Sequence, residues 1–132
     1  MKKENSNNIG VFIFVNDNMQ KNILLQELLY GIEEEQVLSI IEYHYDRCDS
    51  ETDLKTLAHL AAQSSYFGVG IALSIDGVAL HHKNLCMENP VYLLSGHNLN
   101  ARNCRTLGMI SARLIKKFIL PELEIVLDCA ED

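Results

Sequence analysis

The chain has 132 residues, 48% of them hydrophobic, which suffices for the core of one domain and is not typical of disorder. Its net charge of −7 argues against nucleic acid or an anionic membrane surface as a partner, since both favour a basic face. No apolar run approaches the roughly 20 residues needed to cross a bilayer.

The N-terminus and the cysteines bear on the compartment. The polar residues 1–8 precede an apolar run that is short for a signal-peptide core and is followed by Asn-Asp-Asn rather than by a cleavage site. The four cysteines form no C-x-x-C pair, so neither a zinc site nor a disulfide framework is expected. We therefore expect a cytoplasmic protein with reduced thiols.

Strands and helices alternate in the first half of the chain. Residues 9–15 (IGVFIFV) form a continuous apolar run, typical of a strand buried on both faces. Asn-Asp-Asn then offers capping side chains, and apolar residues recur at helical spacing from Leu25 to Ile32, which predicts a helix over residues 18–35. Residues 37–45 indicate a second strand, and the sequence DSETD begins a second helix.

The second half adds a hairpin to this alternation. Residues 67–75 predict a third buried strand, and the Asp-Gly dipeptide that follows is a strong hairpin signal. Residues 78–82 should therefore return antiparallel to that strand. A short strand is expected at 90–94, and a last helix over 103–117.

This order of elements predicts an α/β fold, a three-layer α/β/α domain with a mixed, mostly parallel sheet of about five strands. The single domain should span residues 9–117. Residues 1–8 are expected to form a flexible leader, and residues 118–132 a C-terminal tail that belongs to the domain or is loosely attached. Pro121 should end any continuation of the last helix.

Familiar catalytic motifs are missing from the sequence. The loop after the first strand contains no glycine, so Walker-type and dinucleotide fingerprints are absent, and we expect no nucleotide to be bound by this chain itself. None of the five histidines belongs to a recognisable nucleophile motif. A hydrogen-bonded structural role is the simpler interpretation of each histidine.

Two polar clusters are candidates for ligand contacts. His81, His82, Lys83 and Asn84 end a strand, and ligands favour the C-terminal edge of an α/β sheet, although a polar turn is the simpler explanation. Arg102 and Arg105 lie near the start of the last helix, where backbone N–H groups attract anions. Exposed loop charge is the simpler account of the two arginines.

A run of three glutamates ends the first helix, where the helix dipole disfavours negative charge. Helical spacing turns Glu34 away from the apolar stripe, while Glu33 and Glu35 lie at its flanks as ordinary charge. Glu34 should therefore be the most outward-facing of the three. A lone carboxylate is a poor magnesium site, so a metal bound at Glu34 would need ligands from a partner.

Three motifs together resemble a known family. LLYGIEEEQ in the first helix, ALHHKNL followed by PVYLL, and SARLIKK in the last helix are similar to the small subunit of diol and glycerol dehydratase-reactivating factors. The position of Gly108 between Arg105 and Arg113 also fits. Gln36 replaces the glycine that would cap the helix, so the end of that helix is expected to be less sharply defined.

The resemblance implies a non-catalytic small subunit that acts with a large ATPase subunit, in a heterotetramer. Such a factor releases damaged cobalamin from adenosylcobalamin-dependent dehydratases, which it contacts transiently, by exchange of its small subunit with the dehydratase medium subunit. A microcompartment location is a further implication. The chain alone should hold no tight cofactor, while Glu34 would share an interfacial Mg²⁺ with the large subunit. The implied partner contacts are Glu33, Glu34, Glu35, His81, His82, Lys83, Asn84, Arg102 and Arg105.

Two alternatives remain open from the sequence. The chain could be a medium-type structural subunit of the dehydratase itself, in which case it would assemble with the catalytic dehydratase subunit. It could also be a small enzyme that uses the cluster of His81, His82 and Lys83.

Overall fold

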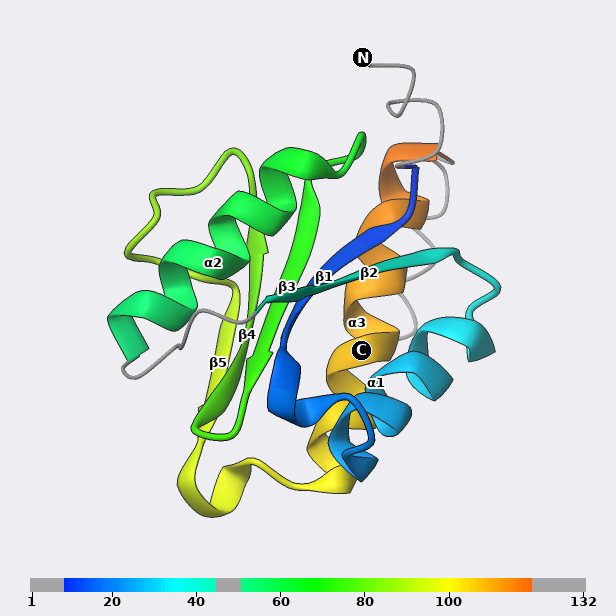
Figure 1. Ribbon diagram of the computed structural model, residues 1–132. Coiled ribbons are helices and arrows are strands. Elements are labelled where there is room, and N and C mark those ends of the chain that lie inside the picture. The colour runs from blue at the N-terminus through cyan, green and yellow to red at the C-terminus, as the bar shows by residue number, and fades with distance from the viewer. Residues whose placement is uncertain (1–8, 45–50, 120–132) are drawn as a thin grey trace.

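A computed structural model describes residues 9–44 and 51–119, so the expected leader and most of the expected tail lie outside the described residues. Five strands form one sheet in the order β2-β1-β3-β4-β5 (Figure 1). The strands are β1 (Val11–Asn16), β2 (Ser39–His44), β3 (Val69–Ser74), β4 (Gly77–His82) and β5 (Tyr92–Ser95). The helices are α1 (Ile23–Glu34), α2 (Glu51–Ser64) and α3 (Ala101–Ile119), with the 3-10 turns η2 (Asp17–Met19) and η3 (Gly96–Asn98).

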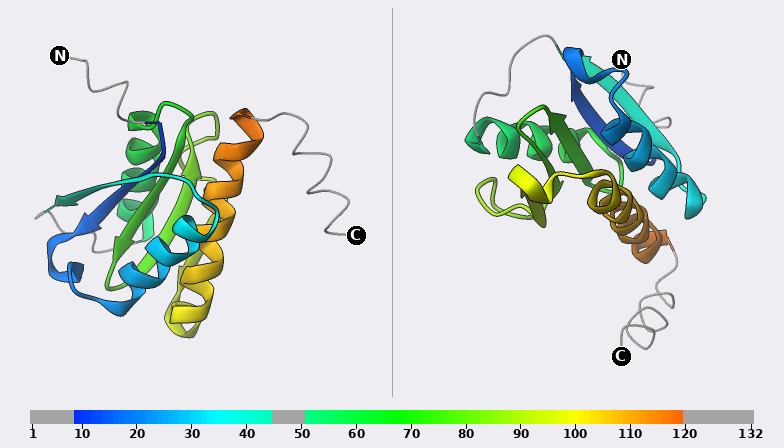
Figure 2. Two further views of the ribbon diagram at one scale, coloured as in Figure 1. Left: turned by 90° about the vertical axis from the view of Figure 1, so that its right-hand side faces the viewer. Right: turned by 90° about the horizontal axis from the view of Figure 1, so that it is seen from below.

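The sheet is mixed and mostly parallel, as predicted. β1 pairs in parallel with both β2 and β3, while β4 pairs antiparallel with β3 and with β5. Among the described strands only β4 therefore runs against the others. Figures 1 and 2 show α2 on one face of the sheet and α1 with α3 on the other, which gives the three layers.

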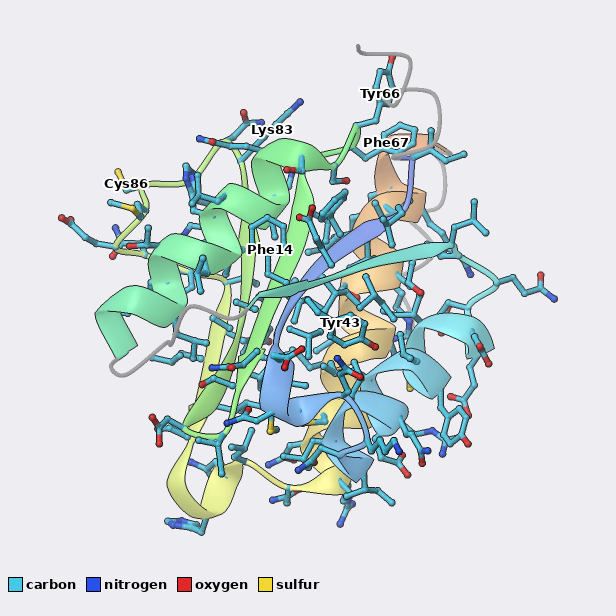
Figure 3. All side chains as sticks on the ribbon, in the orientation of Figure 1. Phe14, Tyr43, Tyr66, Phe67, Lys83 and Cys86 are labelled. Atoms are coloured by element: carbon cyan, nitrogen blue, oxygen red, sulfur yellow. The ribbon has the colours of Figure 1, made fainter. Side chains whose placement is uncertain are left out.

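The side chains of β1 explain why it lies in the centre of the sheet. Val11, Ile13 and Val15 are fully buried in the main core between the sheet and the pair α1 and α3. The alternate residues Phe12 and Phe14 pack towards α2, against Ala61 (Figure 3). The continuous apolar run thus fills both faces, as the sequence predicted. None of the described helices is long and apolar enough to span a membrane.

The first helix begins later than predicted. Asp17–Met19 forms the short turn η2, and α1 starts at Ile23 behind the cap Asn22, whose side-chain oxygen accepts the N–H of Leu24 at 2.8 Å. The predicted cap at Asn-Asp-Asn was wrong because Asn16 ends β1, and Asp17 and Asn18 belong to the turn. The sequence contains two clusters of capping residues, and periodicity alone does not distinguish between them.

The hairpin between β3 and β4 returns antiparallel as predicted, but its turn lies one residue earlier than the Asp-Gly dipeptide. Ser74 pairs with Gly77, so the loop consists of Ile75 and Asp76, and the N–H of Asp76 donates to the hydroxyl of Ser74 at 3.2 Å. A Cβ at Gly77 would lie 2.7 Å from the carbonyl oxygen of Leu94 in β5. The glycine thus allows close strand packing.

The end of α1 is sharply defined, which corrects the expectation drawn from Gln36. Gln36 adopts the left-handed conformation, with φ of 62°, in place of the usual glycine. Its N–H donates to the carbonyl of Glu33 at 2.9 Å, and the N–H of Val37 reaches the carbonyl of Ile32 at 3.4 Å. These two bonds form a Schellman motif, and Val37 packs against the core beside Ile32.

Helices α1 and α3 cross with their backbones in contact. A Cβ at Gly31 would overlap the carbonyl oxygen of Arg105, and a Cβ at Gly108 would overlap the carbonyl oxygen of Leu28. Both glycines are therefore required by the close approach of the two helices. This crossing places the glutamate-rich end of α1 beside the basic side chains of α3.

Candidate partner-binding site

The acids at the end of α1 face the bases of α3 across this crossing. Glu35 accepts from Nε of Arg113 at 3.2 Å and from Nζ of Lys116 at 2.8 Å. Glu34 is paired with Arg105, which lies about two turns before Arg113 along α3. The cations of α3 thus compensate negative charge that the dipole of α1 would otherwise disfavour.

Arg105 lies at the centre of a second group of charges. One of its guanidinium nitrogens reaches Glu27 at 3.4 Å, and the other donates to Glu34. The guanidinium carbon also lies 5.6 Å from the ring centre of Tyr30, a cation–π arrangement. The hydrogen bond to Glu34 is the main reason why the pKa of Arg105 is raised. The group stays accessible to a partner, since the side chain of Glu34 is 44% exposed.

Glu35 is less accessible than its neighbours, and this corrects its interpretation as ordinary flanking charge. Only 16% of its side-chain surface is exposed. Burial alone would raise its pKa, but the hydrogen bond from Lys116 and the charges of Lys116 and Arg113 outweigh burial and lower the pKa below 4.5. Glu35 therefore joins α1 to α3.

Glu33 and Glu34 are both exposed, while Glu33 forms no ion pair with any residue in the described ranges 9–44 and 51–119. Helical spacing had placed Glu34 furthest from the core. The structure exposes it but also engages it through Arg105. The pairing could not be read from the sequence, because the two residues are 71 positions apart.

The arginines near the start of α3 have separate environments. Arg102 is exposed in the first turn, while Arg105 faces α1, so exposed loop charge was the wrong interpretation of Arg105. The side-chain oxygen of Asn100 accepts the N–H of Asn103 at 2.9 Å. One of the backbone donors at this helix end is therefore satisfied within the chain.

His81 has a structural role rather than an accessible one. It is fully buried, its Nε2 donates to the carbonyl oxygen of Met87 at 2.9 Å, and its Nδ1 accepts the N–H of His82 at 3.0 Å. His59 of α2 donates in the same way to the carbonyl of Leu85 at 3.0 Å. Both histidines fasten the loop between β4 and β5, and the side chain of His81, for which a partner contact was expected, has no exposed surface.

The polar cluster of residues 81–84 was expected at the C-terminal edge of the sheet. It lies instead at the opposite edge, where the parallel strands begin. Because β4 is antiparallel, its last residue His82 pairs with Val69, the first residue of β3. Lys83 is exposed there, beside α2 and away from α1 (Figure 3), and the next residue, Asn84, is also exposed. Burial and then the charge of Lys83 lower the pKa of His82. The cluster is thus separate from the glutamates of α1.

Two further residues of the site were missed by sequence reasoning. Glu27 and Tyr30 both contact Arg105 and stand on the same face of α1 as Glu34. Tyr30 and Glu34 follow Glu27 by three and seven residues, and this helical spacing was the signal available in the sequence.

Other features of the described chain offer little chemistry. A groove of 280 Å³ between β5 and α3 is lined by apolar and amide side chains, among them Tyr92, Leu94, Asn103 and Ile110. Cys104 is buried, and burial together with nearby Glu27 raises its pKa to about 11, so its thiol stays protonated at neutral pH.

Known proteins resemble this chain along most of its length. Residues 10–121 match the family described as dehydratase medium subunit. The chain is 34% identical to the propanediol dehydratase-reactivating factor small subunit of Salmonella typhimurium, over 70% of this chain and 75% of that protein. It is also 34% identical to the probable glycerol dehydratase-reactivating factor small subunit of Citrobacter freundii, over 88% of this chain and 94% of that protein.

Solved structures agree with the sequence comparison. A diol dehydratase-reactivating factor complexed with ADP and Mg²⁺ matches with a TM-score of 0.70 and 31% identity, over 82% of this chain and 93% of that chain. A glycerol dehydratase reactivase matches with the same TM-score and identity, over 82% and 92%. The fold and the three sequence motifs thus agree, and the chain belongs to the dehydratase medium subunit family, alongside the small subunits of the dehydratase-reactivating factors.

Proposed function

We propose that the chain is the non-catalytic small subunit of a factor that reactivates an adenosylcobalamin-dependent diol or glycerol dehydratase. The observation that carries the proposal is the 34% identity to a reactivating-factor small subunit across 94% of that protein's length. Because the match covers nearly the whole relative, the similarity is not confined to a shared core. The accessible charge on α1 and α3 supplies a surface for a partner.

The proposed partner is a large ATPase subunit, with which the chain would form a heterotetramer. The matching family carries the description dehydratase medium subunit, while the named relatives are small subunits of reactivating factors. One fold therefore serves subunits of both assemblies. This supports a mechanism in which the chain exchanges with the medium subunit of the dehydratase, with which it would be in transient contact while damaged cobalamin escapes.

The residues of this chain fit Mg²⁺ only as part of a shared site. No group of three or more metal-ligating side chains occurs among the described residues, so a cation bound here would take most of its ligands from the partner and from water. Glu34 is exposed and carries two carboxylate oxygens, of which Arg105 contacts Oε2. We propose Glu34 as the ligand from this chain.

Substitution at Glu34 tests this interface. Glu34→Gln keeps the shape of the side chain but removes its charge, so we expect about tenfold weaker association with the large subunit at millimolar Mg²⁺. Association of the variant should also depend less on Mg²⁺. Both effects are measured by titrating the two purified subunits by calorimetry, with Mg²⁺ and with EDTA.

Glu33→Gln is the matched control, since it removes an equal charge from the neighbouring exposed position. Its association should stay within about twofold of wild type, as expected for a charge at the rim. Equal affinity of Glu34→Gln and wild type, both with Mg²⁺ and with EDTA, would rule out the proposed metal bridge.

A second candidate is a medium-type structural subunit of the dehydratase, which the description of the family itself favours. Such a subunit would assemble stably with the catalytic dehydratase subunit rather than with an ATPase. The small-enzyme alternative is disfavoured because both ring nitrogens of His81 are engaged in holding the loop.

A further inference from the structure

The groove between β5 and α3 is suited to an apolar occupant. Its volume is 280 Å³, and its apolar lining consists of Tyr92 and Leu94 of β5 with Leu107 and Ile110 of α3. None of the described residues that line it is charged. Small-molecule sites typically have volumes of about 300–1,000 Å³ and a few convergent polar groups. The groove therefore fits a few aliphatic side chains better than it fits a cofactor or an anion.

Two of the polar side chains in the groove already have partners within the chain. Nδ2 of Asn103 donates to the carbonyl oxygen of Asn98 at 2.8 Å. The hydroxyl of Thr106 donates to the carbonyl oxygen one turn earlier in α3, at 3.2 Å. Tyr92, by contrast, leaves 47% of its surface exposed. An occupant would thus gain mainly by burying apolar surface.

The segment that follows α3 has the apolar side chains for this groove. Residues 120–132 lie outside the described residues and, from residue 122 onwards, beyond the match to the dehydratase medium subunit family. Their sequence is LPELEIVLDCAED. In an extended chain alternate residues point to opposite sides, so Leu123, Ile125 and Leu127 would share one side. The residues between them would share the other side.

Charge also matches this segment to α3. Residues 120–132 contain five acids and no base, whereas α3 contains five bases and no acid. Lys117 follows Ile110 by seven residues, or about two helical turns, so it continues the face of α3 that lines the groove. Charge complementarity therefore favours the C-terminal segment of the chain itself as the occupant.

The segment is long enough to reach the groove. α3 starts beside η3 and ends at the opposite end of the sheet, so the chain must turn back along the helix, and Pro121 prevents the helix from continuing (Figure 1). The distance along the helix axis from Ile119 back to Leu107 is about 18 Å. Six extended residues span about 20 Å, so after a turn at Pro121 the side chain of Leu127 would lie level with Leu107.

We propose that the C-terminal segment folds back antiparallel to α3 and occupies the groove between β5 and α3. Ile125 and Leu127 point into the groove, while Val126 points to solvent and Glu122 lies near Lys117. The inference does not depend on the proposed function, because it concerns contacts within one chain. It makes the C-terminal segment a part of the domain rather than a loosely attached tail.

Methyl nuclear magnetic resonance of the isolated full-length chain tests the docking. With isoleucine, leucine and valine methyl groups labelled, we expect nuclear Overhauser contacts between Ile125 and Ile110. Ile125→Asp places a charge against the apolar lining, so it should release the segment and shift the methyl resonances of Ile110 and Leu94. Val126→Asp is the matched control, because it adds the same charge on the side that faces solvent, and it should leave those resonances in place.

A substitution in the groove tests the same contact from the other side. Thr106 lines the groove at an exposed position, so Thr106→Glu should repel the acidic segment and abolish the contacts of Ile125 while α3 stays folded, as judged by circular dichroism.

Several results would overturn the docking. One is the absence of contacts between Ile125 and the groove in the wild-type chain, and another is equal groove resonances in Ile125→Asp and Val126→Asp. Contacts that appear only at high protein concentration would assign the groove to the C-terminal segment of a second copy. Groove resonances that shift only when the purified large subunit is added would assign it to that partner, and both results contradict docking within one chain.

Discussion

Gln36 adopts a backbone conformation that most side chains disfavour, and in doing so it ends α1. A left-handed residue other than glycine costs roughly 1–2 kcal/mol. The Schellman hydrogen bonds of Gln36 and Val37 hold it there nonetheless. The sequence motif correctly predicted that Gln36 stands where a glycine would end the helix. That Gln36 would adopt the same turn could not be predicted from the motif.

Gln36→Gly should therefore stabilise the protein. Glycine removes the backbone strain at φ of 62°. The higher conformational entropy of glycine in the unfolded chain offsets only part of this gain, so the free energy of unfolding should rise by about 0.5–1 kcal/mol. Urea unfolding followed by circular dichroism measures the change. Gln26→Gly, at an exposed position inside α1, should instead lower the stability by about 1 kcal/mol. If Gln36→Gly lowered the free energy of unfolding, the inference that Gln36 is strained would be wrong.

Glu35 gives the stability a dependence on acid. Its pKa is lowered in the folded state, so its contribution is present above the unfolded value of 4.5 and is lost as the pH falls through the lower folded value. Glu35→Gln should cost about 0.5–1 kcal/mol at pH 7, and this cost should shrink as the pH falls below 4.5. Urea unfolding at several pH values tests this. A cost of Glu35→Gln that stays constant with pH would argue against the ion pairs.

At the scale of the elements, α1 and α3 form a pair that is fixed by two glycines and by the charges around them. Sequence patterns located both helices and both glycines, but not the crossing that joins them. That contact depends on tertiary packing between residues far apart in the chain. Hence the fold class could be predicted, while the pairing of Glu34 with Arg105 could not.

Gly108→Ala tests the crossing. The added methyl group would overlap the carbonyl of Leu28, so the helices must shift, and we expect a loss of about 1–3 kcal/mol in the free energy of unfolding. Thermal and urea unfolding provide the measurement. Thr106→Ala, at an exposed position of the same helix, should change the stability by less than about 0.5 kcal/mol. Similar effects of the two substitutions would contradict the close approach.

The hairpin shows a different limit of sequence reasoning. The antiparallel return of β4 was predictable from local turn chemistry, because hairpin signals are short in range. The burial of His81 was not, since it depends on the carbonyl of Met87 six residues later and on α2 above it. The expected ligand edge was also wrong, although the antiparallel return already implied that the end of β4 lies beside the first residue of β3.

At the scale of the whole molecule, two polar regions of the described chain lie apart from each other. One lies at the α1–α3 crossing and contains Glu27, Glu34 and Arg105, and the other follows β4 beside α2 with Lys83 and Asn84. The first combines accessible charge with a fixed backbone, which suits a partner that brings a cation. The second is organised by the buried His81 and by His59 of α2, which hold a loop.

The most direct test of the account is a competition for assembly. The full-length chain is mixed with Mg²⁺, the purified ATPase subunit of a reactivating factor and the purified catalytic subunit of the dehydratase from the same source, and the complexes are separated by size-exclusion chromatography. We expect the chain to elute with the ATPase subunit, and Glu34→Gln to weaken that complex while Glu33→Gln does not. Stable elution with the catalytic dehydratase subunit instead would show that the chain is a structural subunit of the dehydratase.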